Sequence, residues 1–540
     1  MNNDYITALD TQFPAQFKTR AFAGIKTMFI AAAAGAALLL WICSTAPAQE
    51  DIGQMIRSTR TLRDKLMKDP YRPGYHFVTL EGGCSPFDCN GAIYWKGRYH
   101  LFYIFQNEKG HCWGHASSSN LVHWRHHPTA LAPEPGDPDR RIYSGSALVN
   151  KHGVPTIFYH GVKAGMCIAT STDDELIHWT KSPHNPVIAI PKEGDPAYGV
   201  YNVFDPVAWM HDRHYYAALG NLQLLRKFGE NMKPEDRGDT LYLFRSDDLI
   251  NWTYLHPLYK SDRKWTEETE DNACPEFFKL GDRWVLLFIS HNKGCQYYIG
   301  RFENERFYPE SHARMSWVDH AFFAPESCRD DKGREIMWAW IFDGREKTLR
   351  ESSGWSGTMS LPRVLAPAKD NTLRISPPAE LEILRYNPRQ MQNLTIATDA
   401  ELPLKDIRGN SIELSLEMAP QAARRFGLKV CASPDGEEQT VVFYDTLQKK
   451  LGIDTTRSGI DQGPKSVEAG PLELGPGEPL KLRVFVDKSV VEIFANDRQA
   501  VMRRIYPTRK DSLGVALFSQ GGPTKIQNLK AWQMMPSNPY

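Results

Sequence analysis

The octapeptide SSSNLVHW at residues 117–124 recurs along the chain, as STDDELIHW at 171–179 and as SDDLINW at 246–252. Each copy places polar turn formers before apolar residues and ends on a Trp that would cap a short strand. Strand–turn–strand patterns interleave with these copies, at 92–103, 206–220 and 277–290. Antiparallel units that recur roughly every 50 to 80 residues predict a radial array of sheets, a β-propeller.

The pattern changes near residue 385, where short alternating strands such as SIELSLEM and LKLRVFVD are separated by turns rich in Gly, Pro and Asp. Such spacing predicts a β-sandwich. We therefore expect an all-β protein with a propeller over 79–370 and a sandwich over 385–540. An extension over 49–78, with a helix at 52–68, precedes the propeller.

The N-terminal region contains an apolar run, MFIAAAAGAALLLWIC at 28–43, with basic residues before it and the small residues Ala46 and Ala48 after it. This order is typical of an export signal that is cleaved after Ala48. The alternative is a retained anchor, since the run is only slightly shorter than the ~17 residues that a tilted span needs. Residues 1–48 are thus predicted to be a signal peptide or an anchor, and the protein to be periplasmic or extracellular.

The composition excludes several partners. The chain has 540 residues with 64 Lys+Arg against 64 Asp+Glu, which leaves no basic footprint for nucleic acid. Eight cysteines follow residue 48, without a CxxC pair or zinc spacing, so we expect no metal site. Cys84 could form a disulfide with Cys89 or Cys112, and buried free thiols are the alternative.

Carboxylates precede each of the three hairpins: Asp88 the first, Asp205 the second, and Glu270, Asp271 and Glu276 the third. The innermost strand of each propeller blade begins near the central channel, so these acids are expected to converge there. Two or three carboxylates around one pocket can hydrolyse a glycoside without metal or cofactor. The alternative for each single acid is ordinary turn chemistry.

A series of motifs resembles the signatures of glycoside hydrolase family 32, which holds invertases, inulinases, levanases and other β-fructofuranosidases. The resemblance runs from Cys84 to about Gln533. In chain order the motifs are PFDCNG (86–91), FYIFQ (102–106), CWGHASSSNLVHW (112–124), YSGSALV (143–149), FDP (204–206), ACPEFF (273–278), FFAPES (322–327), WSGTMSLPR (355–363) and LRVFVDKSVVEIFANDRQAVMRRIYP (482–507).

The resemblance implies a five-bladed β-propeller followed by a C-terminal β-sandwich, and retaining hydrolysis through a covalent glycosyl-enzyme. On this interpretation Asp88 matches the nucleophile and Asp205 the acid that holds sugar hydroxyls and stabilises the transition state. For retention, the nucleophile and the acid/base should lie ~5 Å apart.

The resemblance also implies substrate contacts. Ser144 matches a substrate-contacting serine, and Tyr143 stands where an aromatic wall is usual. Gln106 lies two residues past the family's glutamine and could replace it only if the strand shifts. Trp113 could line the pocket or belong to the blade core.

Three positions depart from the family's pattern. Phe87 stands where the family has Asn, Phe204 where it has Arg, and Ala273 where it has the acid/base Glu. We expect the acid to be displaced to Glu270 or Asp271, with Glu276 ranked third. The two phenyl rings should favour a different hydroxyl pattern or a more apolar sugar face.

Three functions remain open at this point. The first is a secreted hydrolase of fructosides or related furanosides, acting on an oligo- or polysaccharide. The second is a noncatalytic carbohydrate-binding relative that has lost the acid/base. The third is a furanosidase for a sugar other than fructose, such as an arabinofuranoside.

Overall fold

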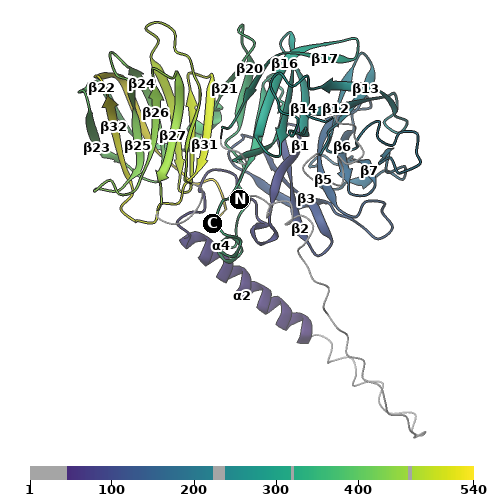
Figure 1. The fold of residues 1–540 in the computed structure, drawn as a ribbon. Coiled ribbons are helices and arrows are strands. Elements are labelled where there is room, and N and C mark those ends of the chain that lie inside the picture. Colours follow the sequence, from purple (N-terminus) through teal and green to yellow (C-terminus); the bar gives the residue numbers. More distant parts are fainter. Residues whose placement is uncertain (1–45, 223–236, 318–320, 460–464, 540) are drawn as a thin grey trace, which may run out of the picture. The chain divides into compact units, whose positions relative to one another are not determined.

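The computed structural model describes residues 46–222, 237–317, 321–459 and 465–539 (Figure 1). The chain divides into a unit that ends at Lys68 and a large unit, Asp69–Pro539. The described part of the first unit is helix α2 (Ala46–Lys68), which includes the helix predicted at 52–68. Residues 1–45 of the predicted signal or anchor lie outside the described residues. No helix in the described ranges has the length and apolar composition of a membrane span.

Five antiparallel sheets form the first domain of the large unit, with consecutive strands as neighbours in each sheet. The innermost strands β1, β5, β10, β14 and β18 contact one another in a closed ring. This confirms the predicted five-bladed propeller.

The strands of the five blades are, in order, β1 (Phe87–Trp95), β2 (Arg98–Asn107), β3 (Gly110–Ser118) and β4 (Arg125–Leu131); β5 (Ile142–Val149), β6 (Pro155–Gly161), β7 (Gly165–Thr170), β8 (Thr180–Lys181) and β9 (Ile188–Ala189); β10 (Pro206–His211), β11 (His214–Leu219), β12 (Thr240–Ser246) and β13 (Thr253–Lys260); β14 (Ala273–Leu280), β15 (Arg283–Ser290), β16 (Gly294–Glu303) and β17 (Arg306–Arg314); and β18 (Phe322–Arg329), β19 (Glu335–Ile341), β20 (Arg363–Pro367) and β21 (Leu373–Ser376). Two short helices, η1 (Gly82–Cys84) and α4 (Lys347–Ser353), lie outside the blades.

The repeated sequence forms the turn between the third and fourth strands of a blade. Leu121, Leu176 and Leu249 occupy equivalent places in it, each buried and each with a positive φ, of 64°, 55° and 68°. The indoles of Trp179 and Trp252 donate to the carbonyls of Leu176 and Leu249, at 2.8 and 2.9 Å. The Trp side chain therefore stabilises a turn in which the leucine adopts a strained backbone conformation.

The propeller extends beyond the predicted boundary at residue 370. Pro367 ends β20, and a tight turn then returns the chain into β21, which completes the fifth blade at Ser376. The proline therefore marks a strand end within the blade.

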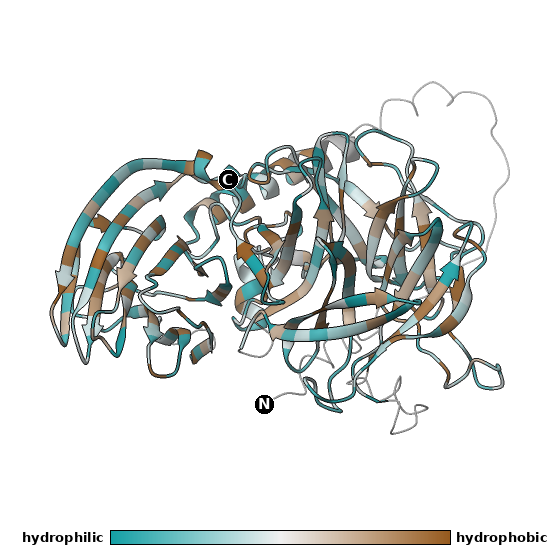
Figure 2. Ribbon diagram, turned by 90° about the horizontal axis from the view of Figure 1, so that it is seen from above, coloured by the Kyte–Doolittle hydropathy of each residue, from teal (hydrophilic) through white to brown (hydrophobic). Residues whose placement is uncertain are grey.

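The second domain consists of two six-stranded antiparallel sheets, β22-β33-β24-β29-β30-β31 and β23-β32-β25-β26-β27-β28, which confirms the predicted sandwich. Apolar side chains from both sheets form one core, and Figure 2 shows hydrophilic and hydrophobic residues alternating along the strands. The link is η3 (Ala379–Leu384), and the strands are β22 (Arg385–Ile396), β23 (Ala400–Arg408), β24 (Ser411–Ala419), β25 (Arg425–Ala432), β26 (Gln439–Asp445), β27 (Lys450–Arg457), β28 (Val467–Pro471), β29 (Leu480–Asp487), β30 (Val490–Ala495), β31 (Gln499–Arg504), β32 (Gly514–Gln520) and β33 (Thr524–Met534).

A buried ion pair joins the two domains. Arg363 of β20 donates to Glu492 of β30 at 2.7 Å, and both side chains are fully buried. His76, from the segment before the propeller, donates from its Nδ1 to Asp487 at 3.0 Å, and its Nε2 lies 3.4 Å from Glu492. The charges are therefore compensated within the contact.

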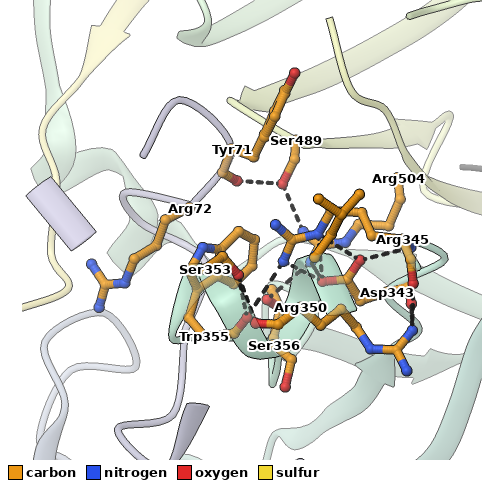
Figure 3. Close-up of polar contacts among 12 residues, drawn as sticks. Tyr71, Arg72, Asp343, Arg345, Arg350, Ser353, Trp355, Ser356, Ser489 and Arg504 are labelled. Carbon is orange, nitrogen blue, oxygen red and sulfur yellow. Dashed lines mark hydrogen bonds and ion pairs between the residues drawn. The ribbon is translucent and has the colours of Figure 1, made fainter. Parts of the chain in front are cut away.

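A second polar cluster also joins the two domains (Figure 3). Arg345 donates to Asp343 at 2.7 Å, and Arg504 of the sandwich lies 3.5 Å from the same carboxylate. Arg504 also donates to Ser489, whose hydroxyl donates to the carbonyl of Tyr71. The segment before the propeller, the fifth blade and the sandwich thus share one hydrogen-bonded network.

All eight cysteines of the described residues are free thiols. The predicted possibility of a disulfide from Cys84 to Cys89 or Cys112 is therefore not realised. Cys89 and Cys112 are buried in the first blade, on β1 and β3, where each packs as a small apolar side chain.

We expect Arg363→Met to lower the free energy of unfolding by about 3–5 kcal/mol, because it leaves Glu492 buried without its cation. Urea unfolding followed by tryptophan fluorescence measures the change. The matched control is Arg301→Met, which removes an ion pair whose Arg side chain is 45% exposed. This substitution should lower the free energy of unfolding by less than about 1 kcal/mol. Equal effects of the two substitutions would contradict a structural role for the buried pair.

Candidate active site

The site is built by the first residues of the inner strands. Asp88, Asp205, Cys274 and Ala324 occupy equivalent places in four blades, and each has a positive φ, of 28°, 35°, 44° and 47°. The strand registers of the first, fourth and fifth blades shift at this point, as in a β-bulge. A bulge turns a side chain out of the regular alternation, and strained non-glycine residues gather at functional sites.

Asp88, Asp205 and Ser144 come together, as expected from the strand starts. Ser144 Oγ donates to Asp88 Oδ2 at 3.2 Å. Cys274 connects the two acids: its Sγ lies 4.0 Å from Asp88 Oδ2 and 3.6 Å from Asp205 Oδ2, and its backbone N–H donates to Asp205 Oδ2 at 3.2 Å. Sequence reasoning missed Cys274, although its place just after Ala273 in the third repeated strand start was a usable signal.

The electrostatics of this pair raise the pKa of Asp88 into the neutral range. Burial and the neighbouring Asp205 raise the pKa of Asp88 to about 7, and the opposing effect of His291 is smaller. Near neutral pH Asp88 therefore exchanges a proton, whereas an exposed aspartate would be fully ionised.

The other oxygen of Asp205 is directed toward His160 of β6. Asp205 Oδ1 and His160 Nδ1 are 3.7 Å apart, and both atoms are buried without a hydrogen-bond partner in the part of the chain that the structure describes. Buried polar atoms are normally paired, so a bound hydroxyl or water would complete this site. No sequence motif marked His160.

Glu270 and Asp271, the expected acids, are held by protein donors. Glu270 accepts from the N–H of Glu267 at 2.9 Å and from Gln296 at 2.7 Å. Asp271 is fully buried and accepts the N–H of His291 at 2.8 Å, and its Oδ2 lies 2.9 Å from His291 Nδ1. The expectation that one of them faces the pocket is therefore wrong, because strand alternation does not extend into the turn before β14.

Glu276 is also removed from the nucleophile. It lies fully buried on β14 at the place that Glu326 occupies on β18, and burial raises the pKa of both carboxyls. Ser327 donates to Glu276 at 3.3 Å, and Glu326 accepts the N–H of Ala92 at 2.9 Å. Glu276 is therefore held within the inner strands, beside Glu326.

A small cavity lies in the channel beneath the two aspartates. Its lining residues are Asn90, Ser144, Gly145, Asp205, Pro206, Cys274, Pro275 and Glu326. The floor of the site is thus polar, and it is narrow because five strand starts meet there.

Aromatic rings surround the site at the level of the residues that precede the bulges. Eight rings follow one another with centroid separations from 4.8 to 6.4 Å, and we call this set the aromatic arc. Its members, in order, are Phe204, His160, Tyr143, His111, Phe87, Trp340, Phe323 and His291. The inner strand that contributes no ring is β14, where the corresponding residue is Ala273.

Two predicted substrate-binding residues lie behind this arc. Gln106 Nε2 is 2.5 Å from His111 Nε2, so Gln106 holds an arc residue. Trp113 is fully buried, and its indole donates to the carbonyl of Tyr143 at 2.9 Å. The prediction that Trp113 lines the pocket is therefore wrong, because the ring fills the space between the first two blades. Phe87, Tyr143, Ser144 and Phe204 lie at the site itself.

Family models match the chain over both domains. The model described as the glycosyl hydrolases family 32 N-terminal domain matches residues 86–377, and the family 32 C-terminal model matches 380–533. A sucrose-6-phosphate hydrolase from Zymomonas mobilis is 30% identical over 515 residues, with 88% of this chain and 94% of the relative covered. A levanase from Bacillus subtilis is 30% identical over 522 residues, with 87% and 72% covered.

Solved structures share the fold. Fructan 1-exohydrolase IIa from Cichorium intybus superimposes with a TM-score of 0.76 at 24% identity, covering 87% of this chain and 98% of the other. A sucrose-6-phosphate hydrolase from Lactobacillus gasseri gives a TM-score of 0.72 at 24% identity, with 89% and 97% covered.

The raised pKa of Asp88 predicts a stability effect. The folded state binds this proton more tightly than the unfolded state, so the contribution of Asp88 to stability is greatest below about pH 4 and is lost as the pH rises through about 7. Ionisation of Asp88 then costs the folded state up to about 4 kcal/mol. Asp88→Asn removes the ionisable group. The variant should therefore be more stable than the wild type at about pH 8 and should lose that advantage near pH 4.

Urea unfolding across this pH range measures the difference. Asp212→Asn, at an exposed turn in the third blade, is the matched control and should show no such pH dependence. A constant difference between Asp88→Asn and wild type at every pH would contradict the raised pKa.

Proposed function

Because this chain belongs to glycosyl hydrolase family 32 and is a glycosidase acting on fructosides, we propose that it hydrolyses them with retention through a glycosyl-enzyme on Asp88. The observation that carries the proposal is the meeting of Asp88, Asp205 and Ser144 at three strand starts of one channel. Retaining glycosidases need a carboxylate nucleophile at such a place.

The contacts of Asp88 suit it to attack. The Ser144 hydroxyl bonds Oδ2 and fixes the carboxylate plane, which leaves Oδ1 to approach the anomeric carbon. A pKa of about 7 makes Asp88 a more basic nucleophile than an exposed aspartate, at the cost of requiring a pH near or above neutrality.

Asp205 supports the same step from the side. Its Oδ2 is fixed by the N–H of Cys274, while Oδ1 has no hydrogen-bond partner among the described residues and can accept a sugar hydroxyl. Positive charge develops on the sugar ring in the transition state, and a fixed carboxylate beside it stabilises that charge.

The aromatic arc indicates the class of substrate. None of its eight residues carries a permanent positive charge, so the site favours an unphosphorylated sugar over a sugar phosphate. We propose neutral fructosides of the levan type, by similarity to the levanase named above. Phe87 and Phe204 present apolar surface where the family has Asn and Arg, which also favours a furanoside with fewer hydroxyl contacts as a second candidate.

The N-terminal run at 28–43 supports export of the protein, with cleavage after Ala48. The site would then meet oligo- or polysaccharides outside the cytoplasm. The free thiols do not require an oxidising compartment, but because most of them are buried they are compatible with one.

We expect Asp88→Asn to lower the rate of sugar release at least 10³-fold, on the order expected when a catalytic nucleophile is lost. A panel of sucrose, 1-kestose, levan, a nitrophenyl fructofuranoside and a nitrophenyl arabinofuranoside identifies the substrate, and calorimetry measures binding by the inactive variant. Asp212→Asn is the control and should keep wild-type rates.

The outcomes separate the alternatives. Unchanged release by Asp88→Asn would overturn the nucleophile assignment. Binding of a fructan by the wild type with no release from any member of the panel would support the noncatalytic relative. Release from the arabinofuranoside alone would identify the second candidate.

Export has its own test. The full chain, expressed in a bacterial host with a C-terminal tag, should appear outside the cytoplasm with Gln49 as its first residue. Exchanging Ala46 and Ala48 for Leu should block cleavage and leave the protein associated with the membrane. Retention of an uncleaved wild-type chain at the membrane would instead establish the anchor.

A further inference from the structure

We propose that His291, held by Asp271, is the general acid/base of this glycosidase and takes the place of the carboxylic acid missing at Ala273. The inference rests on the proposed function and names the residue that the reaction lacks. It is carried by the position of His291, by its hydrogen bonds and by the charges around it.

The position of His291 brings it to the vacant place. Ala273 pairs with Ile289 of the adjoining strand β15, and His291 follows two residues later, where β15 has ended. The imidazole is the last ring of the aromatic arc, 6.4 Å from Phe323, and it belongs to the blade whose inner strand, β14, contributes no ring. A side chain from the second strand of the blade thus reaches the place where the first strand offers only a methyl group.

The hydrogen bonds of His291 orient its ring. Asp271 accepts the backbone N–H and pairs with Nδ1 at 2.9 Å, so the carboxylate holds both the main chain and the imidazole of the same residue. A carboxylate at Nδ1 fixes that nitrogen as the donor and leaves Nε2 to exchange a proton with a ligand. The His291 side chain is 27% exposed, whereas Asp271 is fully buried, so only the imidazole can reach a substrate. Asp271 is therefore a positioning residue.

The charges around His291 favour its cationic form. Burial opposes the positive charge, but Asp271, Asp205 and Asp88, from three different inner strand starts, raise its pKa above the ordinary value. Phe323 from β18 adds no charge. In turn the His291 cation lowers the pKa of Asp88, which favours a neighbouring pair of imidazolium acid and carboxylate nucleophile.

The proposed reaction balances in two steps. In the first, Asp88 forms a bond to the anomeric carbon, the glycosidic C–O bond breaks, and the Nε2 proton of His291 passes to the leaving oxygen, which departs as an alcohol. In the second, neutral His291 takes a proton from water, the hydroxide oxygen bonds the anomeric carbon, and the ester to Asp88 breaks. The products are the free sugar and the alcohol, and both residues return to their starting states.

The decisive experiment compares leaving groups in the full-length His291→Asn variant. Asn keeps a donor near the position of Nδ1 for Asp271 but has no ionisable nitrogen. We expect turnover of sucrose or 1-kestose to fall about 10²–10⁴-fold, and turnover of a dinitrophenyl fructofuranoside, whose leaving group needs no proton, to fall less than about tenfold in the glycosylation step. With the dinitrophenyl substrate, added azide should restore turnover of the variant and give a fructosyl azide. Azide attacks the glycosyl-enzyme without the assistance of a base.

A matched control uses another His–Asp pair of the same domain. His214 Nδ1 lies 2.6 Å from Asp247 at the edge of the third blade, away from the channel residues. His214→Asn should leave both substrates and the pH profile unchanged.

The pH profile tests the role of Asp271. The alkaline limb of kcat/KM should report the loss of the His291 proton, and Asp271→Asn should move that limb to lower pH because one of the three raising charges is removed. If Asp271 had only a structural role, Asp271→Asn would lower the rate without moving the alkaline limb of kcat/KM.

The failure of the inference can be told apart from the failure of the proposed function. A wild type that releases sugar from no substrate and forms no adduct on Asp88 overturns the function. A fully active wild type whose His291→Asn variant keeps its sucrose rate, or loses both leaving-group classes equally with no azide product, overturns the role of His291 alone.

Discussion

The closure of five strands into one ring is the constraint on which the site depends. Each inner strand enters the channel where there is no room for a regular pleat, so four of them begin with a residue in the left-handed region. That conformation turns Asp88, Asp205 and Cys274 toward one another from distant parts of the chain. The strain of the backbone and the repulsion of the two carboxylates are therefore concentrated at one end of the channel, and the surrounding blades hold these residues in place.

The three positions that the sequence analysis expects to depart from the family's pattern lie at one structural level. Phe87, Phe204 and Ala273 each precede a left-handed strand start, and all three side chains are apolar. The ionisable function at this level is supplied from the second strand of the fourth blade, by His291. A protonated imidazole carries a positive charge, whereas a protonated carboxylic acid is neutral. The cation therefore balances the negative charge of the two buried aspartates better.

The sequence predicts the blades well because their signals are local. Hairpins, turn residues and the capping Trp residues are each read from fewer than about 15 neighbouring residues, and the equivalence of Asp88 and Asp205 follows from their place before repeated strands. The acid could not be found in this way. Glu270 and Asp271 were assigned by extending strand alternation into a turn, while His291 follows the second strand of the fourth blade and His160 lies near the end of the second strand of the second blade. Their approach to the channel depends on blade packing, which no local pattern contains.

The contact between the propeller and the sandwich has an evolutionary consequence. Arg363 and Glu492 come from different domains, and His76 and Tyr71 join them from a third segment. A gene fusion that gave this propeller a foreign sandwich would bury a lone guanidinium at the seam, and compensating changes would be needed on both sides at once. Exchanging the sandwich for one that lacks a carboxylate at this place would therefore destabilise the propeller as well as the contact.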